Sequence, residues 1–232
     1  SVSIDSISHG DIFIPSVIIS SDDGYATDYT KLYPKISPNK FVFTSNVVSS
    51  LLNNAGYLNT TQLRALKNAG NTIGNHTRDH TNLVTLTEEQ IIAELSDCKN
   101  AIIALGVTDE GDHVICPYDT YNATVLGVLT SWGAKTSGGA GSVQKGQNVF
   151  DYRFPLEINR IDMSTLVNNK LWSDMAVKSM TTFNLLVHDL SNTDTYNIFS
   201  ATIDYIQSLG LQSLTIDEFY RLGSGPLMIA HK

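Results

Sequence analysis

Hydrophobic and polar positions along this chain follow two periods in turn, one typical of buried strands and one typical of helices. Short apolar or β-branched runs that end at polar or turn residues predict strands over residues 16–20, 40–44, 72–75, 113–116, 134–137, 155–161, 183–187 and 211–216. Apolar residues at helical spacing predict helices over residues 59–69, 87–105, 122–132, 166–180, 196–209 and 217–222. Strands and helices therefore alternate, which favours a mostly parallel α/β sheet or barrel.

Two of the predicted helices begin with a recognisable cap. Asn59 is followed by Gln62, and Thr87 by Gln90, at the spacing of a capping box. The 232 residues contain no repeat, linker or low-complexity segment, so we expect a single domain spanning residues 1–232.

Composition narrows the choice of partner. The net charge is −8, which disfavours nucleic acid and anionic membrane surfaces, because both attract basic patches. No apolar run reaches the roughly 18 residues of a membrane span, and no signal peptide is recognisable. Cys98 falls on a predicted helix and Cys116 at a strand end, so we expect two free thiols and no disulfide framework.

Candidate metal ligands follow two of the predicted strands. His76 and His80 are four residues apart, and a helical turn would place both imidazoles on one face, with Cβ atoms roughly 5–6 Å apart. Neutral imidazole is the commonest metal ligand in proteins. Asp22 and Asp23 follow an apolar strand and offer a carboxylate. A His/His/Asp set is the composition of a catalytic metal site, whereas structural sites usually contain cysteines.

Further candidate site residues follow later strands: Pro117 and Tyr118 after the fourth, and His188 after the apolar strand at 183–187. Active sites of α/β barrels lie at the carboxyl ends of strands, so these residues are expected to share one face. Simpler structural interpretations of these residues stay open. Asp22-Asp23-Gly24 alone is typical of a turn, and His188 alone would as readily be a buried core histidine.

Taken in order, these segments resemble the motifs of the polysaccharide deacetylase family, also called carbohydrate esterase family 4 or the NodB-homology domain. The matching segments are Asp22-Asp23-Gly24, His76-Thr77-Arg78-Asp79-His80, Pro117-Tyr118 with Tyr121-Asn122, and Leu186-Val187-His188. The second is a complete His-Ser/Thr-x-x-His motif. The resemblance extends from about residue 14 to about residue 222, and it implies a distorted (β/α) barrel of about seven strands.

The resemblance implies that Asp23, His76 and His80 bind one divalent metal ion. Zinc is the most frequent metal in this family, with cobalt, nickel and manganese as alternatives. Such an ion polarises an acetyl carbonyl as a Lewis acid and lowers the pKa of water toward about 7.

The resemblance also implies the remaining catalytic roles. Asp22 would be the general base and His188 the general acid. The backbone N–H of Tyr118 would stabilise the oxyanion, and Pro117 and Tyr118 would contact the substrate.

Many family members place an arginine before the Pro-Tyr motif to steer the base, but this chain has Ile115 there. A subgroup that acts on poly-N-acetylglucosamine carries the arginine later, before an isoleucine. Arg160 precedes Ile161, so we expect Arg160 to orient Asp22; a surface or structural cation is the plainer reading.

Other departures from the family motifs concern packing and the rim of the cleft. Ser20-Ser21 replaces the threonine-phenylalanine of the first motif, which we expect to change packing more than chemistry. Asp119 replaces the glycine of Pro-Tyr-Gly. The aspartate that tunes the acid histidine in the family is not evident, and Asp162 is a candidate for that role.

We therefore expect a metal-dependent hydrolase that removes acetyl groups from a polysaccharide, with the N-acetyl amide of N-acetylglucosamine as the favoured target. Two alternatives stay open: an O-acetyl esterase acting on xylan or capsular polysaccharide, and a glycan-binding domain without turnover. A polysaccharide substrate predicts an extracellular or cell-surface location. The start at Ser1 is compatible with a domain of a larger surface or viral tail protein.

Overall fold

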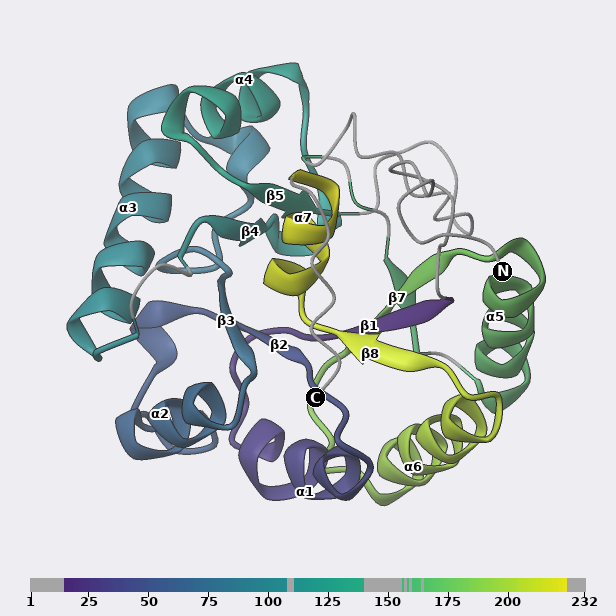
Figure 1. Cartoon of the computed structure of the whole chain (residues 1–232). Helices are drawn as coiled ribbons and strands as arrows, with labels where there is room; N and C mark the ends of the chain where they lie inside the picture. Colours follow the sequence, from purple (N-terminus) through teal and green to yellow (C-terminus); the bar gives the residue numbers. More distant parts are fainter. Residues whose placement is uncertain are drawn as a thin grey trace, which may run out of the picture.

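A parallel β-sheet that curls into a half-barrel forms the centre of the molecule in this computed structural model (Figure 1). The structure describes residues 15–107, 111–139, 156, 158, 160–163 and 165–224. Seven strands lie in the order β5-β4-β3-β2-β1-β7-β6, and β8 pairs with β1 outside this path. Their bounds are Ser16–Ser21 (β1), Thr44–Val47 (β2), Thr72–Asn75 (β3), His113–Ile115 (β4), Thr136–Gly138 (β5), Ile161–Asp162 (β6), Thr182–Val187 (β7) and Gln212–Leu214 (β8).

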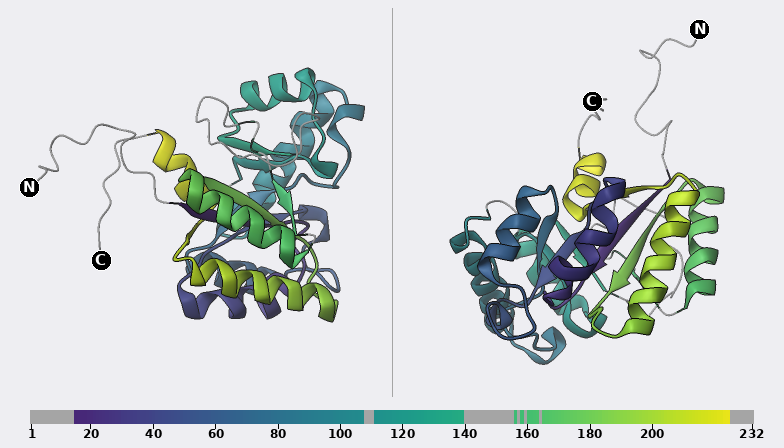
Figure 2. Two further views of the ribbon diagram at one scale, coloured as in Figure 1. Left: turned by 90° about the vertical axis from the view of Figure 1, so that its right-hand side faces the viewer. Right: turned by 90° about the horizontal axis from the view of Figure 1, so that it is seen from below.

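Helices cover the outer side of the curled sheet, and α7 lies over its middle in the view of Figure 1; Figure 2 gives two further views. The α-helices are Tyr33–Ile36 (α1), Thr60–Asn68 (α2), Glu88–Ala104 (α3), Ala123–Trp132 (α4), Leu166–Ser179 (α5), Thr193–Ser208 (α6) and Ile216–Ser224 (α7). The shorter helical turns are Asp28–Leu32 (η2), Ser37–Asn39 (η3), Ser49–Leu51 (η4), Leu83–Thr85 (η5) and Pro117–Asp119 (η6). Within the described part of the chain, no helix combines the length and the apolar character needed to cross a membrane.

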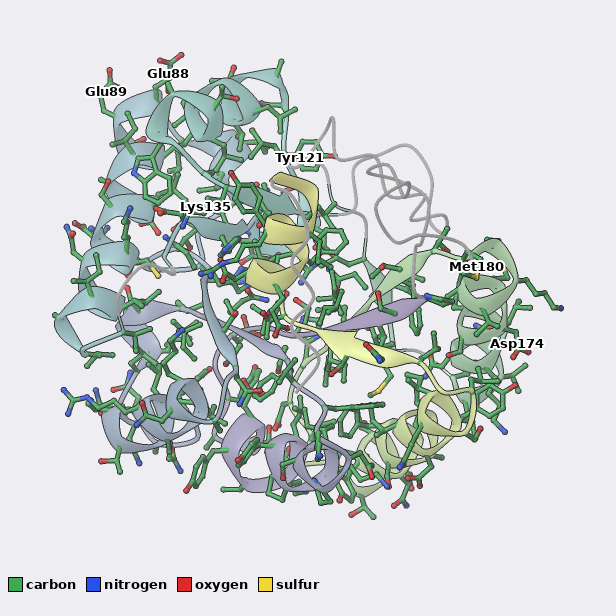
Figure 3. All side chains as sticks on the ribbon, in the orientation of Figure 1. Glu88, Glu89, Tyr121, Lys135, Asp174 and Met180 are labelled. Atoms are coloured by element: carbon green, nitrogen blue, oxygen red, sulfur yellow. The ribbon has the colours of Figure 1, made fainter. Side chains whose placement is uncertain are left out.

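Both predicted capping boxes are confirmed. The Gln62 N–H donates to the Asn59 side chain at 3.0 Å, and the Gln90 N–H donates to the Thr87 hydroxyl at 3.4 Å. Each glutamine side chain in turn accepts the backbone N–H of its cap residue. Acidic residues in the first turn of α3, Glu88 among them, extend into solvent beyond the helix (Figure 3), where they interact favourably with the helix dipole.

The central strand β1 divides the core into two sides. Its alternate residues Val17 and Ile19 belong to the main core between sheet and helices, whereas Ile18 faces Ile216 and Phe219 of α7. Residues 16–18 of β1 pair with β8, and residues 20–21 pair with β2. This change of neighbour along one strand is where the barrel departs from a regular closed sheet.

Most strands lie within one or two residues of their predicted bounds, and two differ more strongly. The apolar run at 40–44 predicted the second strand, but β2 spans Thr44–Val47 and buries Thr44, Ser45 and Asn46. The hydrophobic pattern misplaced this strand because its buried side chains are polar and hydrogen-bond to residues of other segments. The strand predicted at 155–161 is reduced to Ile161–Asp162, and residues 155, 157 and 159 lie outside the described residues.

Candidate active site

Four parallel strands bring polar residues to one edge of the sheet. Asp22 and Asp23 follow β1, His76 follows β3, Pro117 follows β4 and His188 follows β7. The carboxyl ends of parallel strands meet at the same edge, which is where α/β folds build their ligand sites. Residues separated by more than a hundred positions therefore become neighbours.

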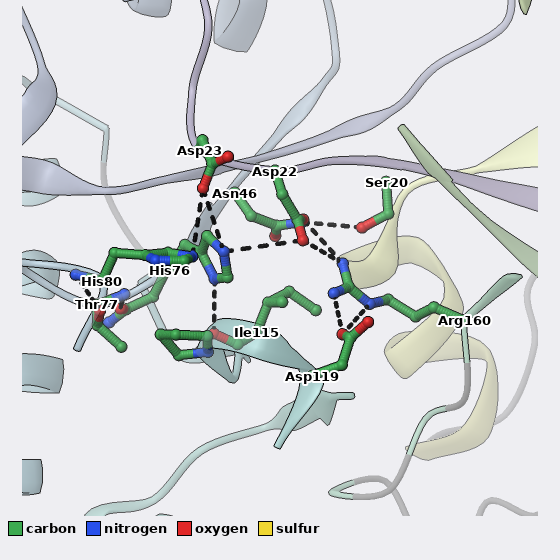
Figure 4. A network of polar contacts seen from close by, with 12 residues as sticks. Ser20, Asp22, Asp23, Asn46, His76, Thr77, His80, Ile115, Asp119 and Arg160 are labelled. Atoms are coloured by element: carbon green, nitrogen blue, oxygen red, sulfur yellow. Dashed lines mark hydrogen bonds and ion pairs between the residues drawn. The ribbon is translucent and has the colours of Figure 1, made fainter. Parts of the chain in front are cut away.

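Asp23, His76 and His80 form a cluster with the composition of a metal site (Figure 4). One ligand atom from each residue lies within 4.8 Å of the other two. The Asp23 Oδ1 atom is 3.6 Å from His76 Nε2 and 3.4 Å from His80 Nε2. Two imidazole nitrogens and one carboxylate oxygen suit zinc and similar divalent metals, so this donor set fits one such cation.

The backbone fixes the tautomer of His76. Its Nδ1 atom lies 2.8 Å from the Ile115 carbonyl oxygen, and because a carbonyl can only accept, Nδ1 carries the proton. The lone pair of the neutral ring is then on Nε2, on the side of Asp23. Burial lowers the pKa of His76, although the Asp22 charge and the bond to Ile115 oppose this. The neutral form that a metal requires is therefore favoured.

The helical turn predicted between His76 and His80 is wrong. The segment is a bend in which Thr77 and His80 have φ values of 69° and 59°, in the left-handed region. The Asn75 side chain accepts the Thr77 N–H at 2.9 Å and donates to the Leu95 carbonyl of α3 at 2.9 Å, which stabilises the bend. The two rings still meet, with centroids 4.7 Å apart and planes inclined by 74°.

Glu94 of α3 anchors the outer part of this loop. Its buried carboxylate accepts the Asp79 N–H at 2.9 Å and the Arg78 guanidinium at 3.2 Å. Its carbonyl oxygen accepts the Arg78 N–H at 3.1 Å. Glu94 was not among the predicted site residues; its only indication in the sequence is an acidic residue on the apolar side of a predicted helix.

Asp22 is buried beside the metal-ligand cluster and is paired with Arg160. The guanidinium Nη1 lies 2.8 Å from Asp22 Oδ1 and 2.7 Å from Oδ2. Asp22 Oδ2 is also 3.8 Å from His76 Nε2. Burial opposes ionisation of Asp22, but the charge and hydrogen bonds of Arg160 and the nearby His76 lower its pKa below the ordinary value. Asp22 is therefore a carboxylate at neutral pH.

Asn46 on β2 contacts Asp22 from a second direction. Its Nδ2 donates to Asp22 Oδ1 and to the Ser20 hydroxyl, each at 2.9 Å. Gly74, its register partner on β3, leaves the necessary room, because a Cβ there would lie 2.1 Å from Asn46 Oδ1. Asn46 was not among the predicted site residues, because it lies in a polar strand; the glycine opposite it was the one indication in the sequence.

Ser21, at the end of β1, takes part in a buried polar network. The hydroxyls of Ser21 and Ser45 donate to the two oxygens of Asp28, at 2.6 and 2.5 Å. Burial raises the pKa of Asp28 to about 7, against the effect of these hydrogen bonds. A titratable carboxyl therefore lies in the protein interior behind the site.

Tyr118 lies at the rim. Its φ is 59°, the residue is 63% exposed, and its ring packs edge-on against His80 with centroids 4.8 Å apart. Pro117 before it is buried.

His188 is exposed at the end of β7, close enough to Asp22 for its charge to favour the ionised carboxylate. Among the described residues, no carboxylate is ion-paired with His188. Asp162, the candidate to tune it, is exposed on β6 beside Leu186.

The two cysteines are free and buried, as predicted. Burial raises the pKa of the Cys116 thiol to about 11 and that of Cys98 to about 12, so neither is a nucleophile at neutral pH. His113, which carries no motif, is buried between Thr136 and Asp217, at 3.0 and 3.1 Å, and links α7 to the sheet.

Comparison with known proteins gives related sequences and folds. A family model described as polysaccharide deacetylase matches residues 14–137, just over half of the chain. The putative polysaccharide deacetylase YxkH of Bacillus subtilis (strain 168) is 30% identical over 83 residues, which are 36% of this chain and 30% of YxkH. The chain thus matches less than a third of the length of this curated relative.

Solved structures share the fold at low sequence identity. The Streptococcus pyogenes deacetylase PplD in complex with acetate has a TM-score of 0.55 and 21% identity, over 62% of each chain. A family 4 carbohydrate esterase from Streptomyces lividans in complex with acetate has a TM-score of 0.60 and 20% identity, over 86% of this chain and 91% of that one. The predicted distorted (β/α) barrel is thereby confirmed, and the match over residues 14–137 shows that this chain belongs to the polysaccharide deacetylase family.

Proposed function

We propose that this protein is a metal-dependent hydrolase that removes acetyl groups from a polysaccharide, with N-acetylglucosamine units as the substrate. The observation that carries the proposal is an ionised carboxylate, Asp22, placed beside but outside a His/His/Asp ligand cluster. Metal ligands alone would suit a structural or regulatory site. A separate base next to them indicates hydrolysis, because that reaction needs a proton acceptor as well as an electrophile.

Asp23, His76 and His80 would hold the metal ion, for which we propose zinc. A divalent ion at this place supplies Lewis-acid polarisation of the acetyl carbonyl and eases the ionisation of water. The His76 Nδ1–H bond to Ile115 orients its ring for this purpose.

Asp22 would take the proton of the attacking water. Its Oδ1 accepts from Asn46 and Arg160, and its Oδ2 accepts from Arg160 and lies 3.8 Å from His76 Nε2. The arrangement leaves Oδ2 as the oxygen placed to accept a proton near the ligand cluster. Attack of water on the acetyl carbon would form the new C–O bond as this proton moves to Asp22.

The Tyr118 N–H would stabilise the developing oxyanion, because the turn at Pro117 carries this residue to the rim beside His80. His188 would donate a proton to the departing amine as the C–N bond breaks, giving acetate and a glucosamine unit. Its exposure at the edge of the site leaves it accessible to substrate. Pro117 and Tyr118 would contact the sugar.

Support for an amide substrate comes from Arg160, which precedes Ile161 as the arginine of the poly-N-acetylglucosamine subgroup precedes an isoleucine. The Tyr121-Asn122 pair is weaker support, because Asn122 already has a structural role: its side chain accepts the Val125 N–H at 2.9 Å and caps α4. An O-acetyl esterase acting on xylan or capsular polysaccharide is therefore the second candidate.

A glycan-binding domain without turnover is disfavoured by the charge arrangement at Asp22. A buried carboxylate costs free energy unless it is paired, and a binding domain gains nothing from one beside metal ligands. We further propose an extracellular or cell-surface location, since acetylated polysaccharides of this kind are found there.

Acetate release from matched substrates tests the proposal. We would compare N-acetylglucosamine oligomers with O-acetylated xylan, with zinc or cobalt added. Acetate from the oligomers supports the N-deacetylase, and acetate from xylan alone supports the esterase. Zinc binding without release from any acetylated glycan would leave the binding domain as the function.

A further inference from the structure

Arg160 is shared between two carboxylates, only one of which belongs to the proposed base. Its Nη1 contacts Asp22 at 2.7 and 2.8 Å, whereas its Nε lies 3.2 Å from Asp119 Oδ1 and its Nη2 also contacts Asp119 (Figure 4). The two carboxylates occupy different edges of the planar guanidinium. Asp119 stands where the family motif has glycine, so this second contact is a feature of this chain.

The burial of Arg160 explains why one partner is not enough to fix it. Its side chain is only 2% exposed, and a buried guanidinium needs partners for its several N–H groups to offset the loss of water. With Asp22 alone the Nε edge would lack an acceptor and the group could turn about its last side-chain bonds. Asp119 occupies that edge, so the plane of the guanidinium is set from both sides.

The backbone at Asp119 is suited to this task. Its φ is 54°, in the left-handed region, where aspartate is tolerated better than most residues. Gly139 packs closely on it, because a Cβ at Gly139 would lie 3.2 Å from the Asp119 carbonyl oxygen. Gly138 lies beside the stem of Arg160, since a Cβ there would be in van der Waals contact with Arg160 Cδ at 3.4 Å. The turn and the arginine are thus both packed against the end of β5.

Asp119 directly follows Tyr118, whose N–H is the proposed oxyanion donor. The Asp119–Arg160–Asp22 chain of contacts therefore links the turn that carries this donor to the base on β1. Movement of one relative to the other would break an ion pair that is largely buried.

We propose that Asp119 is a positioning residue: it fixes the Arg160 guanidinium, and through it the orientation of Asp22 relative to the rim turn. This inference rests on the proposed hydrolytic function, because it assigns Asp119 a role in the same reaction. It also gives the replacement of glycine by aspartate a catalytic meaning, separate from contact with the sugar.

The test is the variant Asp119→Gly, which removes the carboxylate while glycine accepts the positive φ without strain. On the acetylated substrate that the wild type hydrolyses best, we expect kcat to fall about 10- to 100-fold with KM almost unchanged, as for loss of a supporting contact. Asp119→Asn keeps one acceptor for Arg160 and should recover part of this loss. The matched control is Asp112→Asn, which removes a carboxylate that bridges Lys99 and Lys135 before β4, and it should keep wild-type kcat.

A double-mutant cycle shows whether Asp119 acts through Arg160 or independently of it. In an Arg160→Gln background, Asp119→Gly should have little further effect on kcat, because its contribution passes through Arg160. Additive losses, a rise in KM with kcat unchanged, or wild-type kinetics in Asp119→Gly would each overturn the proposal.

A measurement that does not depend on enzymatic activity tests the positioning role separately from the proposed function. In ¹⁵N-labelled protein, the Arg160 Nε–H signal, identified by its loss in Arg160→Gln, should be protected from solvent exchange and should lose this protection in Asp119→Gly. If the wild type releases no acetate, the proposed function fails, and unchanged protection in Asp119→Gly would overturn the positioning role by itself.

Discussion

Arg160 Nη1 contacts both carboxylate oxygens of Asp22, at 2.8 Å from Oδ1 and 2.7 Å from Oδ2, although 138 positions separate the two residues in the sequence. The pair holds Asp22 ionised and leaves it beside, not within, the cluster of Asp23, His76 and His80. The proposed roles of proton transfer and metal binding thus fall on neighbouring residues. That division makes the two roles separable by substitution.

Asp22→Asn should keep metal affinity and lose most turnover. The amide fills the same space but cannot accept a proton from water, so we expect kcat to fall by at least ~100-fold, the scale of general-base catalysis. Zinc binding by calorimetry and acetate release should be measured on the same preparation. Wild-type turnover in Asp22→Asn would remove Asp22 as the base.

His76→Ala should lose metal affinity, in contrast to Asp22→Asn. Loss of a direct ligand should weaken zinc binding by more than the ~10–100-fold typical of supporting residues. His188→Ala is the matched control, since it removes an imidazole at the same edge that is not a ligand; it should bind zinc like the wild type and still lose kcat. Equal loss of zinc affinity in both variants would contradict the assignment of ligands.

Gly74→Ala should disturb the base from a neighbouring strand. The added Cβ would lie 2.1 Å from Asn46 Oδ1 and would displace the side chain that donates to Asp22. We expect a loss of about 1–3 kcal/mol in the free energy of unfolding, as for other overpacked sites, together with lower kcat.

Repeating Gly74→Ala in an Asn46→Ala background tests whether the clash with the Asn46 side chain causes this loss. Without the asparagine side chain the clash is absent, so Gly74→Ala should cost less stability there than in the wild type. An equal cost in both backgrounds would show that the strain lies elsewhere. Chemical denaturation of the four proteins gives the comparison.

Asp28 should make stability depend on pH. The ordinary pKa of 3.8 is raised to about 7 in the fold by burial, so the folded state keeps a proton that the unfolded state releases between these values. The associated stabilisation is complete below about pH 4 and is lost as the pH rises through about 7. Relative to Asp28→Asn, which does not titrate, the wild type should lose up to ~4 kcal/mol of unfolding free energy over this interval.

Urea unfolding of both proteins from pH 4 to pH 8 measures this difference. The difference in unfolding free energy between the wild type and Asp28→Asn should change between pH 4 and 7 and be constant above that range. A gap that is constant throughout, or that changes in the wild type's favour, would show that Asp28 is ionised in the fold at all these pH values.

The residues of the candidate site could be located from the sequence because their signal is local. Asp22, Asp23, His76 and His188 each follow a strand of the sheet, and strand ends meet at one edge whatever the details of packing. The bend after β3 could not be predicted, since its left-handed residue Thr77 depends on hydrogen bonds from Asn75 to α3 and within the loop.

The supporting residues escaped prediction for a different reason. Asn46 and Asp28 are buried polar residues whose hydrogen-bond partners come from other segments, so hydrophobic periodicity does not indicate that they are buried. The polar residues of β2 also explain why this strand was predicted at 40–44, whereas it spans Thr44–Val47. Asp119 was noticed as a departure from the motif, but only the fold places it against Arg160.

The measurement that tests the central claim most directly is acetate release by the wild type before chelation, after chelation, and after zinc is restored. N-acetylglucosamine oligomers should yield acetate in the first and third conditions and none in the second. Release that persists after the metal has been removed would contradict the account, because the Asp23, His76 and His80 cluster would then have no part in the reaction.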